Sequence, residues 1–464
     1  MSQVGTASQP LRVAIFGSGP AAFYAAEHLF KQKDLVVEVD MFDRLPTPFG
    51  LVRGGVAPDH LKIKTVTKVF DGIAANPRFR FFGNVEFGKD FTLAELKNYY
   101  HQILFATGAQ TDRRMGIPGE DLKGSHPATE FVAWYNGHPD FRNHEFNLQV
   151  ERAAVVGVGN VAIDVARLLS LSREELLESD AADYAVEALS NSKIKVVYLL
   201  GRRGPAQAAF TNPEIKEVGD LADCDVVTRA DETQLDELSA NSIAGDRVAQ
   251  KKVEILQGYA IERSLTRPKT LYLRFLVSPV ELISDGDGCV TKMRLVRNTL
   301  VASDTGSLSA KATDQFEEID VGLVFRSVGY RGVPLPDVPF NDRWGVILNQ
   351  AGRVLDPESK QPVTGLYTSG WIKRGPSGVV GTNKPDSVET VMCMLEDLHA
   401  DKVLQPSQAD AASIEQLVRE RKPDYFSYAD WKRLDELELE RGKASGRPRL
   451  KFTSVDDMKQ ALGK

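Results

Sequence analysis

Two glycine-rich turns have the residue types and the spacing of dinucleotide-binding sites. They run over residues 17–22 (GSGPAA) and 157–162 (GVGNVA), and each matches the pattern G-x-G-x-x-G/A. The first glycine of this pattern permits a tight turn, the second lets the backbone approach a pyrophosphate, and the small sixth residue lets helix and strand pack closely. The pyrophosphate would lie at a helix N-terminus, where free N–H groups and the helix dipole favour an anion. A tight turn without a ligand is the alternative for either motif alone.

The two turns differ in the side chains that end the strand after each of them. Asp43 ends the first such strand, and an acid at this place accepts hydrogen bonds from a ribose diol. Arg202 and Arg203 follow the second, and guanidinium groups can bind a 2′-phosphate bidentately. Two charge-assisted hydrogen bonds of roughly 1.5–3 kcal/mol each would favour NADPH over NADH by roughly two to four orders of magnitude. We therefore predict FAD at the first turn and NADP(H) at the second, with two solvated surface arginines as the alternative.

The chemistry predicted for such a pair of sites is hydride transfer between the nicotinamide of NADPH and N5 of the flavin. The protein supplies orientation and electrostatics, and the flavin supplies the chemistry. Arg113, after the loop GAQTD, could reach the same NADP(H) or could be only a charge in a linker between domains. The contacts predicted at the turns are Gly17, Gly19, Pro20 and Ala22 for FAD, and Gly157, Gly159, Asn160, Val161 and Ala162 for NADP(H).

Strands and helices alternate along the chain and would position these turns. A strand, a helix and a second strand are predicted over 12–16, 21–31 and 36–42, and again over 153–156, to about 171, and over 195–200. This recurrence predicts an α/β fold with two doubly wound, Rossmann-like nucleotide-binding domains. The other predicted elements are a helix over 59–75, a strand over 99–108, a polar helical insertion over 172–191, alternating strands over 253–301 including 274–283, strands over 321–329 and 365–370, and a helix over 387–398.

Composition and charge are those of an ordinary globular protein. The 464 residues are 42% hydrophobic and 26% charged, which suggests two to three domains. A formal charge of −7 gives no reason to expect nucleic acid as a partner. No apolar run is long enough for a membrane span, and residues 1–10 lack the features of a secretory signal or transit peptide. The last ~60 residues read as charged helices, and we interpret the run over 434–443 as a solvated helix face.

The three cysteines, Cys224, Cys289 and Cys393, are far apart in the sequence. Without a C-x-x-C motif, neither a redox-active disulfide of that kind nor an iron–sulfur or zinc cluster is supported, and no metal is expected. The pattern indicates reduced thiols and a cytoplasmic location.

Five stretches of the sequence resemble the adrenodoxin-reductase type of ferredoxin–NADP⁺ reductase, in its bacterial form, within the glutathione-reductase-like fold. They are residues 45–64 (LPTPFGLVRGGVAPDHLKIK), 157–167 (GVGNVAIDVAR), 201–214 (GRRGPAQAAFTNPE), 367–384 (YTSGWIKRGPSGVVGTNK) and 446–451 (GRPRLK). The resemblance covers essentially the whole chain after the first ten residues, and long ungapped motifs of this kind are highly specific.

The resemblance implies a discontinuous FAD domain over 1–108 and 331–464, with an NADP domain inserted over 109–330, and one-electron delivery to a ferredoxin. It also implies site residues by position. Those that match FAD-contacting positions are Gly19, Ala22, Asp43, Leu51 and Val85, with Trp371, Gly378, Val379 and Val380 at the flavin ring. Those that match NADP-contacting positions are Asn160, Val161, Arg202, Arg203 and Glu214, with Gly378 near both cofactors.

The resemblance further pairs His60 with Glu214 beside the nicotinamide and the flavin, and links Asp164 with them. Taken alone, His60 at a predicted helix start would more often be a cap or core residue. An acid/base role is conceivable for all three, but hydride transfer to flavin needs no obligate acid. We therefore expect positioning and tuning rather than indispensable catalysis.

Trp371 could simply be a residue of the hydrophobic core. It follows Gly370, where many related flavoproteins carry an aspartate, so the flavin contact here must differ from theirs. Residues 375–382 precede a predicted helix whose start would aim N–H groups at the N1/O2 edge of the flavin.

The function predicted from these residues is that of an FAD-dependent NADPH:ferredoxin oxidoreductase. The alternatives are an NADPH-dependent disulfide reductase, which the missing C-x-x-C opposes, a flavin monooxygenase, and a redox-sensing flavoprotein that is not an enzyme. The expected partner is a ferredoxin or a similar small acidic electron carrier, and the chain is expected to be a monomer. Arg53, Lys62 and Lys64 could form its docking surface, but they could equally face solvent or bind FAD phosphates.

Overall fold

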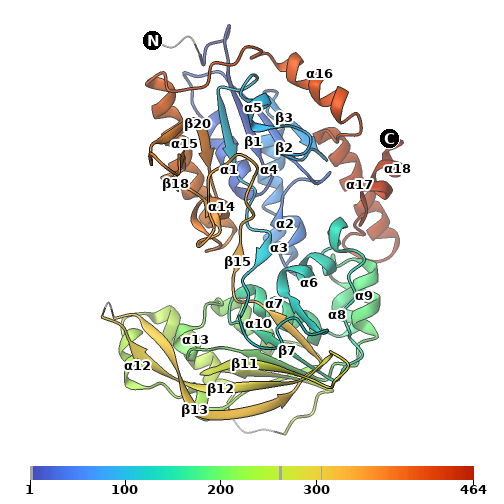
Figure 1. Cartoon of the computed structure of the whole chain (residues 1–464). Helices are drawn as coiled ribbons and strands as arrows, with labels where there is room; N and C mark the ends of the chain where they lie inside the picture. Colours follow the sequence, from blue (N-terminus) through green and yellow to red (C-terminus); the bar gives the residue numbers. More distant parts are fainter. Residues whose placement is uncertain (1–3, 261–263, 305) are drawn as a thin grey trace. The chain divides into compact units, whose positions relative to one another are not determined.

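The computed structural model describes residues 4–260, 264–304 and 306–464, which divide into two compact units (Figure 1). The first unit comprises Met1–Thr111, Asn136–Asp140 and Tyr330–Lys464, and the second comprises Asp112–Tyr135 and Phe141–Gly329. Two short strands, β5 (Thr111–Asp112) and β15 (Tyr330–Arg331), lie where the chain passes between the units. Each unit is built on a largely parallel sheet with helices, which confirms the predicted α/β fold class.

The first unit contains a seven-stranded sheet with the order β18-β19-β20-β4-β1-β2-β3. Strand β1 pairs in parallel with both β2 and β4, in the register Phe16 to Phe42 and Phe16 to Phe105. β18 and β19 extend the sheet as antiparallel strands. The strands are β1 (Leu11–Phe16), β2 (Val37–Asp43), β3 (Phe79–Gly83), β4 (Gln102–Phe105), β18 (Asn349–Gln350), β19 (Arg353–Leu355) and β20 (Pro362–Thr368), and a separate hairpin pairs β16 (Phe340–Asn341) with β17 (Val346–Ile347).

Helices cover both faces of this sheet (Figure 1). One apolar core joins the sheet to α1, α4, α15 and α17, and a second joins its other face to α5 and α16. Because β1 is buried along its whole length, it reads as a continuous apolar run. The helices of this unit are α1 (Pro20–Phe30), α2 (Leu51–Gly54), α3 (Leu61–Lys64), α4 (Thr67–Ala74), α5 (Leu93–Leu96), α14 (Trp371–Arg374), α15 (Asn383–His399), α16 (Ala411–Arg421), α17 (Tyr428–Ala444) and α18 (Val455–Leu462).

The second unit contains a six-stranded parallel sheet with the order β6-β14-β7-β8-β10-β9. A three-stranded antiparallel sheet of β11, β12 and β13 shares an apolar core with β7 and β14. The strands are β6 (Ser125–Pro127), β7 (Arg152–Val156), β8 (Val196–Leu200), β9 (Cys224–Thr228), β10 (Lys269–Arg274), β11 (Val277–Ser284), β12 (Val290–Ala302), β13 (Leu308–Asp320) and β14 (Leu323–Arg326). The helices are α6 (Ala128–Tyr135), α7 (Asn160–Ser170), α8 (Arg173–Leu177), α9 (Asp183–Ser190), α10 (Asn212–Gly219), α11 (Ala230–Thr233), α12 (Glu237–Ser242) and α13 (Arg247–Gly258).

The helix predicted over 59–75 is two helices, α3 and α4, and that prediction was wrong. The Oγ1 of Thr65 donates to the carbonyl of Lys62 at 2.7 Å, and the Oγ1 of Thr67 donates to the carbonyl of Lys64 at 2.9 Å. Threonine hydroxyls that bond nearby carbonyls compete with the regular helical pattern. The turn between the two helices is the result.

The segment 172–191 is helical and mainly polar, as predicted, but it forms two helices and carries a buried apolar side. Helices α8 and α9 are separated at Ala182, whose backbone is extended and whose N–H donates to the carbonyl of Tyr135 at 2.9 Å. Leu176, Val186 and Leu189 are buried. These side chains pack as parts of the second unit.

Two strand predictions were also wrong. Residues from Val253 onward finish helix α13, whose buried Ala249, Val253 and Leu256 have helical spacing. The run 274–283 is interrupted between β10 and β11, because Leu276 adopts a φ of +56°. The strands predicted over 99–108 and 321–329 are shorter than expected, since β4 and β14 contain only their central residues.

Candidate functional site

The first glycine-rich turn is shaped by crowding at one glycine and open space at the next. Gly17 has a φ of +98°, and a Cβ there would lie 2.4 Å from the carbonyl oxygen of Ala106, so only glycine fits. A Cβ on Gly19 would meet nothing within 4 Å. Helix α1 begins at this place without a side-chain cap and with Pro20 in its first turn, and Ala22 is buried behind it. The turn can therefore offer backbone N–H groups to an anion.

Asp43, at the end of β2, ties this turn to the sheet. Its Oδ2 accepts from the N–H of Ser18 at 2.9 Å and from the Oγ of Ser18 at 2.5 Å, while its Oδ1 accepts from the N–H of Leu45 at 2.9 Å. Burial raises the pKa of the Asp43 carboxyl above its ordinary value, although the bonds from Ser18 and Leu45 oppose that shift. A carboxylate has about four acceptor positions, so capacity remains for a ribose hydroxyl.

The other residues predicted to contact FAD near this turn lie in the same unit. Leu51 begins α2 and is 37% exposed. Val85 is buried, and its N–H donates to the carbonyl of Asp43 at 2.9 Å. The structure thus joins Val85 to Asp43 through the backbone.

Arg53 does not face solvent, and the charged run over 434–443 is not simply a solvated face. Glu438 is fully buried, and its carboxylate accepts from the guanidinium of Arg53 at 2.9 and 2.5 Å and from that of Arg449 at 2.7 Å. These cations hold the pKa of Glu438 below its ordinary value despite the burial that opposes it. The ion pair fixes α2 to α17, and it removes Arg53 from the candidate docking residues.

Trp371 and its neighbours form a second predicted FAD-contacting segment in the first unit. Trp371 begins α14, is half-buried, and donates from Nε1 to the carbonyl of Ser377 at 3.2 Å. Gly378 has a φ of +80°, and a Cβ there would lie 2.3 Å from the Oγ1 of Thr382. Val379 is 53% exposed, whereas Val380 packs against the apolar core. A short 3₁₀ turn over Val380–Thr382 leads directly into α15.

The second glycine-rich turn repeats the geometry of the first. Gly157 has a φ of +134°, and a Cβ there would lie 2.2 Å from the carbonyl oxygen of Ser327. A Cβ on Gly159 would meet nothing within 4 Å, and Gly159 precedes α7 without a side-chain cap. Ala162 is fully buried and Val161 is half-buried.

Arg202 and Arg203 follow β8, beside this second turn. Within the described residues, neither guanidinium has a carboxylate partner. Arg203 donates weakly to the carbonyls of Leu308 and Gln207, both at 3.5 Å. Burial, and then the charge of Arg202, lower the pKa of Arg203. An anion bound here, such as a 2′-phosphate, would offset both the burial of the Arg203 guanidinium and the repulsion from Arg202.

Asn160 and Glu214 are brought together through Thr211. The N–H of Thr211 lies 3.1 Å from the Oδ1 of Asn160 and 3.2 Å from the Oε2 of Glu214, and its hydroxyl donates to the same Glu214 oxygen. Thr211 and Glu214 form the capping box of α10. Because the carbonyl of Val158 also accepts from Ala209 and Phe210 at 2.9 and 3.1 Å, the loop before α10 is fixed to the glycine turn.

The remaining predicted residues are divided between the units. His60 lies in the first unit, at the N-cap position of α3, and is half-buried. Asp164 lies in the second unit on α7, is 8% exposed, and accepts from the guanidinium of Arg167 at 3.3 Å. Arg113 is exposed, and its N–H donates to the carbonyl of Gly329 at 2.9 Å within the second unit.

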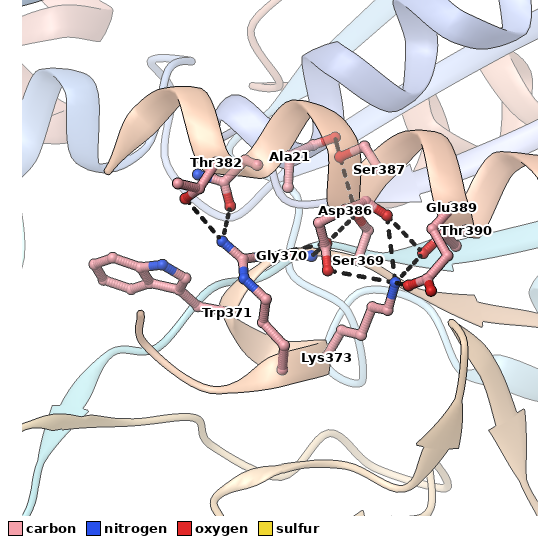
Figure 2. A network of polar contacts seen from close by, with 12 residues as sticks. Ala21, Ser369, Gly370, Trp371, Lys373, Thr382, Asp386, Ser387, Glu389 and Thr390 are labelled. Atoms are coloured by element: carbon pink, nitrogen blue, oxygen red, sulfur yellow. Dashed lines mark hydrogen bonds and ion pairs between the residues drawn. The ribbon is translucent and has the colours of Figure 1, made fainter. Parts of the chain in front are cut away.

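Sequence reasoning missed a buried carboxylate beside Gly370. Asp386, from α15, accepts from the N–H of Gly370 at 2.6 Å and lies 3.3 Å from Nζ of Lys373 (Figure 2). The only signal in the sequence was an acid in the first turn of a helix that follows a glycine-rich loop. Glu438 was missed because its partner Arg53 is far away in the sequence, and the contact of Thr211 with Asn160 was missed for the same reason.

Two features are absent from the described part of the chain. None of its helices is long and apolar enough to cross a membrane. No group of three or more histidine, cysteine, aspartate or glutamate side chains among residues 4–260, 264–304 and 306–464 could hold a metal ion.

Comparison with known proteins places this geometry among flavoprotein reductases. The family model described as pyridine nucleotide-disulphide oxidoreductase matches residues 11–198. The NADPH-ferredoxin reductase FprA of Mycobacterium tuberculosis is 42% identical over 459 residues, covering 97% of this chain and 98% of that protein. The mitochondrial NADPH:adrenodoxin oxidoreductase of Arabidopsis thaliana is 38% identical, covering 97% of this chain and 95% of that protein.

A solved structure is similar over the same length. The structure described as Mycobacterium tuberculosis FprA in complex with NADPH matches with a TM-score of 0.92 and 41% identity, covering 98% of this chain and 100% of that one. The likeness includes both units and both glycine-rich turns.

Proposed function

The chain belongs to the family of FprA-type ferredoxin–NADP reductases, and from this membership we propose that it transfers reducing equivalents from NADPH through FAD to a ferredoxin. When bound, FAD accepts a hydride at N5 and releases its electrons singly, which links a two-electron donor to a one-electron acceptor. The observation that carries the proposal is the repeated glycine turn with an acid beside one copy and two arginines beside the other.

FAD is assigned to the first unit. The crowded Gly17, the open Gly19 and the uncapped start of α1 suit a pyrophosphate, and Asp43 retains acceptor capacity for a ribose. The other residues proposed to hold FAD are Pro20, Ala22, Leu51, Val85, Trp371, Gly378, Val379 and Val380.

NADP(H) is assigned to the second unit. Gly157 and Gly159 repeat the phosphate turn, and Arg202 and Arg203 are proposed to bind the 2′-phosphate because no carboxylate among the described residues pairs with them and Arg203 bonds only weakly to carbonyls. The other residues proposed to contact NADP(H) are Asn160, Val161, Ala162, Glu214 and Arg113. Arg113 follows the point where the chain enters the second unit.

His60, Glu214 and Asp164 are proposed to position the reacting groups. Glu214 already caps α10, and Asp164 already pairs with Arg167. Side chains engaged in this way can hold a neighbouring group in place without a proton transfer of their own. Their loss should therefore slow the reaction without abolishing it.

The partner is proposed to be an acidic ferredoxin that docks on basic residues of the first unit. Lys62 is exposed and Lys64 half-buried, whereas Arg53 is occupied by Glu438. We also propose a cytoplasmic location, on the evidence of three cysteines that form no disulfide.

The test is the visible spectrum of the purified protein under anaerobic conditions, recorded before and after NADPH and NADH in parallel. The expected result is a bound flavin that NADPH bleaches rapidly and NADH bleaches slowly, followed by NADPH-dependent reduction of a ferredoxin. A protein that binds no FAD, or that responds equally to both coenzymes, would contradict the proposal.

A further inference from the structure

The end of β20 turns sharply into α14 at a residue that only glycine can occupy. Gly370 has φ +79° and ψ −149°, and a Cβ there would lie 2.7 Å from the Cβ of Ala21. Residue 370 therefore cannot carry a side chain of its own. Any carboxylate needed at this place must come from another element.

Asp386 supplies that carboxylate from α15. Its side chain is 8% exposed, and its Oδ2 accepts from the N–H of Gly370 at 2.6 Å and from the Oγ of Ser369 at 3.1 Å (Figure 2). These two bonds fix the turn directly before Trp371. The carboxylate thus holds the backbone from which the predicted flavin-ring segment starts.

The next residue on α15 connects this turn to the first glycine-rich turn. The Oγ of Ser387 donates to the carbonyl of Ala21 at 2.9 Å and lies 3.0 Å from the Oγ of Ser369. Ala21 is in the first turn of α1. Asp386 and Ser387 together therefore join the two segments assigned to opposite ends of FAD, the pyrophosphate and the flavin ring.

Two cations balance the charge of Asp386. Nζ of Lys373 lies 3.3 Å from Oδ1, and Nη1 of Arg374 lies 3.3 Å from Oδ2. Arg374 also donates from Nη2 to the Oδ1 of Asn383 at 3.1 Å and to the carbonyl of Ser377 at 3.3 Å, so it spans the loop that contains Gly378. Arg374 therefore contacts both Asp386 and this loop.

We propose that Asp386 is a positioning residue of the flavin site, which sets the affinity for FAD and the charge balance beside its ring. This inference rests on the assignment of FAD to the first unit. It predicts that loss of the Asp386 charge loosens the Ser369–Gly370 turn and leaves Lys373 and Arg374 without a buried counter-charge. An excess of positive charge near the ring would favour the anionic reduced flavin.

The test compares Asp386→Asn with Glu389→Gln. Glu389 pairs with the same Lys373, at 2.6 Å, but its side chain is 58% exposed, and no bond joins it to Gly370 among the described residues. The two measurements are the dissociation constant of FAD, from flavin-fluorescence titration of the apoprotein, and the midpoint potential of the bound flavin. Asp386→Asn should weaken FAD binding by roughly ten- to a hundredfold, since a hydrogen bond to a charged group contributes roughly 1.5–3 kcal/mol. Its midpoint potential should become more positive.

Glu389→Gln should leave the dissociation constant of FAD within about twofold of the wild type and the midpoint potential unchanged, because exposed ion pairs contribute little. If Asp386→Asn behaves like Glu389→Gln in a wild type that binds FAD, the inference is wrong and the proposed function stands. If the wild type itself binds no FAD, the proposed function fails instead.

Ser387→Ala is the second variant. If Asp386→Asn gives no folded apoprotein by circular dichroism, Ser387→Ala tests whether the contacts of α15 with the two FAD segments set the affinity for FAD. It keeps the carboxylate but removes the bond to Ala21. FAD should bind about three- to tenfold more weakly, with an unchanged midpoint potential. Unaltered FAD binding in this variant would overturn the proposed link between the two segments.

Discussion

The two glycine-rich turns share a backbone and differ in the charge beside it. In each, the first glycine has a positive φ and approaches a carbonyl so closely that a Cβ would lie 2.4 Å away in the first turn and 2.2 Å away in the second. In each, the second glycine faces open space and a helix begins without a side-chain cap. The first turn is then tied to Asp43, whereas the second lies beside Arg202 and Arg203.

This difference separates two tasks in nucleotide binding, contact with the phosphate groups and discrimination between nucleotides. We propose that the backbone of the turn binds a phosphate group in the same way in both units, because N–H groups at a helix start favour any anion. The side chains at the end of the strand that follows each turn are proposed to distinguish one nucleotide from another. Asp43 is already bonded to its own turn, so the first site is preorganised, whereas the arginines of the second have no carboxylate partner in the described residues.

The largest effects are expected when the crowded first glycine of each turn is replaced, and they test whether the two turns act separately. Gly17→Ala should lose bound FAD, and Gly157→Ala should retain FAD but lose saturation with NADPH. In each variant the new Cβ collides with a main-chain carbonyl at a positive φ, which should lower the free energy of unfolding by about 3 kcal/mol or more. Flavin absorbance of the purified protein and NADPH titration measure the two losses.

Gly72→Ala and Gly258→Ala are the matched controls, since neither Cβ would meet another atom within 4 Å. Both should bind FAD and NADPH normally. If Gly157→Ala loses FAD as well, the two turns do not act separately and the comparison fails.

The second prediction concerns coenzyme choice. Replacing both Arg202 and Arg203 by alanine should lower the ratio of kcat/KM for NADPH to that for NADH by roughly two to four orders of magnitude, because charge-assisted bonds to the 2′-phosphate are lost. FAD content should not change. Steady-state rates with ferricyanide as acceptor give the ratio, and an unaltered ratio would mean that another group recognises the 2′-phosphate.

The third prediction tests the acid of the first turn. Asp43→Asn should weaken FAD binding by about tenfold through the loss of a charged acceptor. Burial raises the pKa of Asp43 in the folded protein, so ionisation of this group disfavours folding, and its contribution to stability falls as the pH rises above about 4. The apoprotein variant should therefore gain stability relative to the wild type between acidic and neutral pH.

Denaturant titrations of both apoproteins at several pH values measure this difference. A difference in the free energy of unfolding that stays constant with pH would show that Asp43 is not perturbed. NADPH-to-NADH preference serves as the control, and it should be the same in variant and wild type.

The parts of the fold that local sequence determines were predictable. Both turns and their flanking strands follow from glycine spacing and apolar runs, and Asp43 and Arg202 could be placed at strand ends by counting along β2 and β8. These predictions succeeded because a strand–turn–helix unit is a local structure whose residue requirements lie within about 30 positions.

The parts that depend on distant partners were not predictable. Glu438 lies in a run of charges, and only the approach of Arg53, far away in the sequence, explains its burial. Asp386 is separated from Gly370 by a loop, so no periodicity connects them. The break between α3 and α4 arises from threonine hydroxyls that a hydrophobic pattern does not represent.

The smallest predicted effect comes from a comparison of one helix cap in each unit. Thr211→Val removes the hydroxyl of the capping box of α10, whose backbone N–H is also bonded to Asn160 of the second turn, and Thr92→Val removes the hydroxyl of the capping box of α5 in the first unit. Each should cost about 0.5–2 kcal/mol of stability, as lost N-caps do. Only Thr211→Val should weaken NADPH binding, by about threefold to tenfold, because it frees the carboxylate of Glu214 beside the backbone N–H that is bonded to Asn160 of the nucleotide turn. Calorimetric titration with NADPH separates the two variants. Equal NADPH affinities at equal losses of stability would show that the cap of α10 serves the fold alone, and that the second turn needs no support from the loop before it.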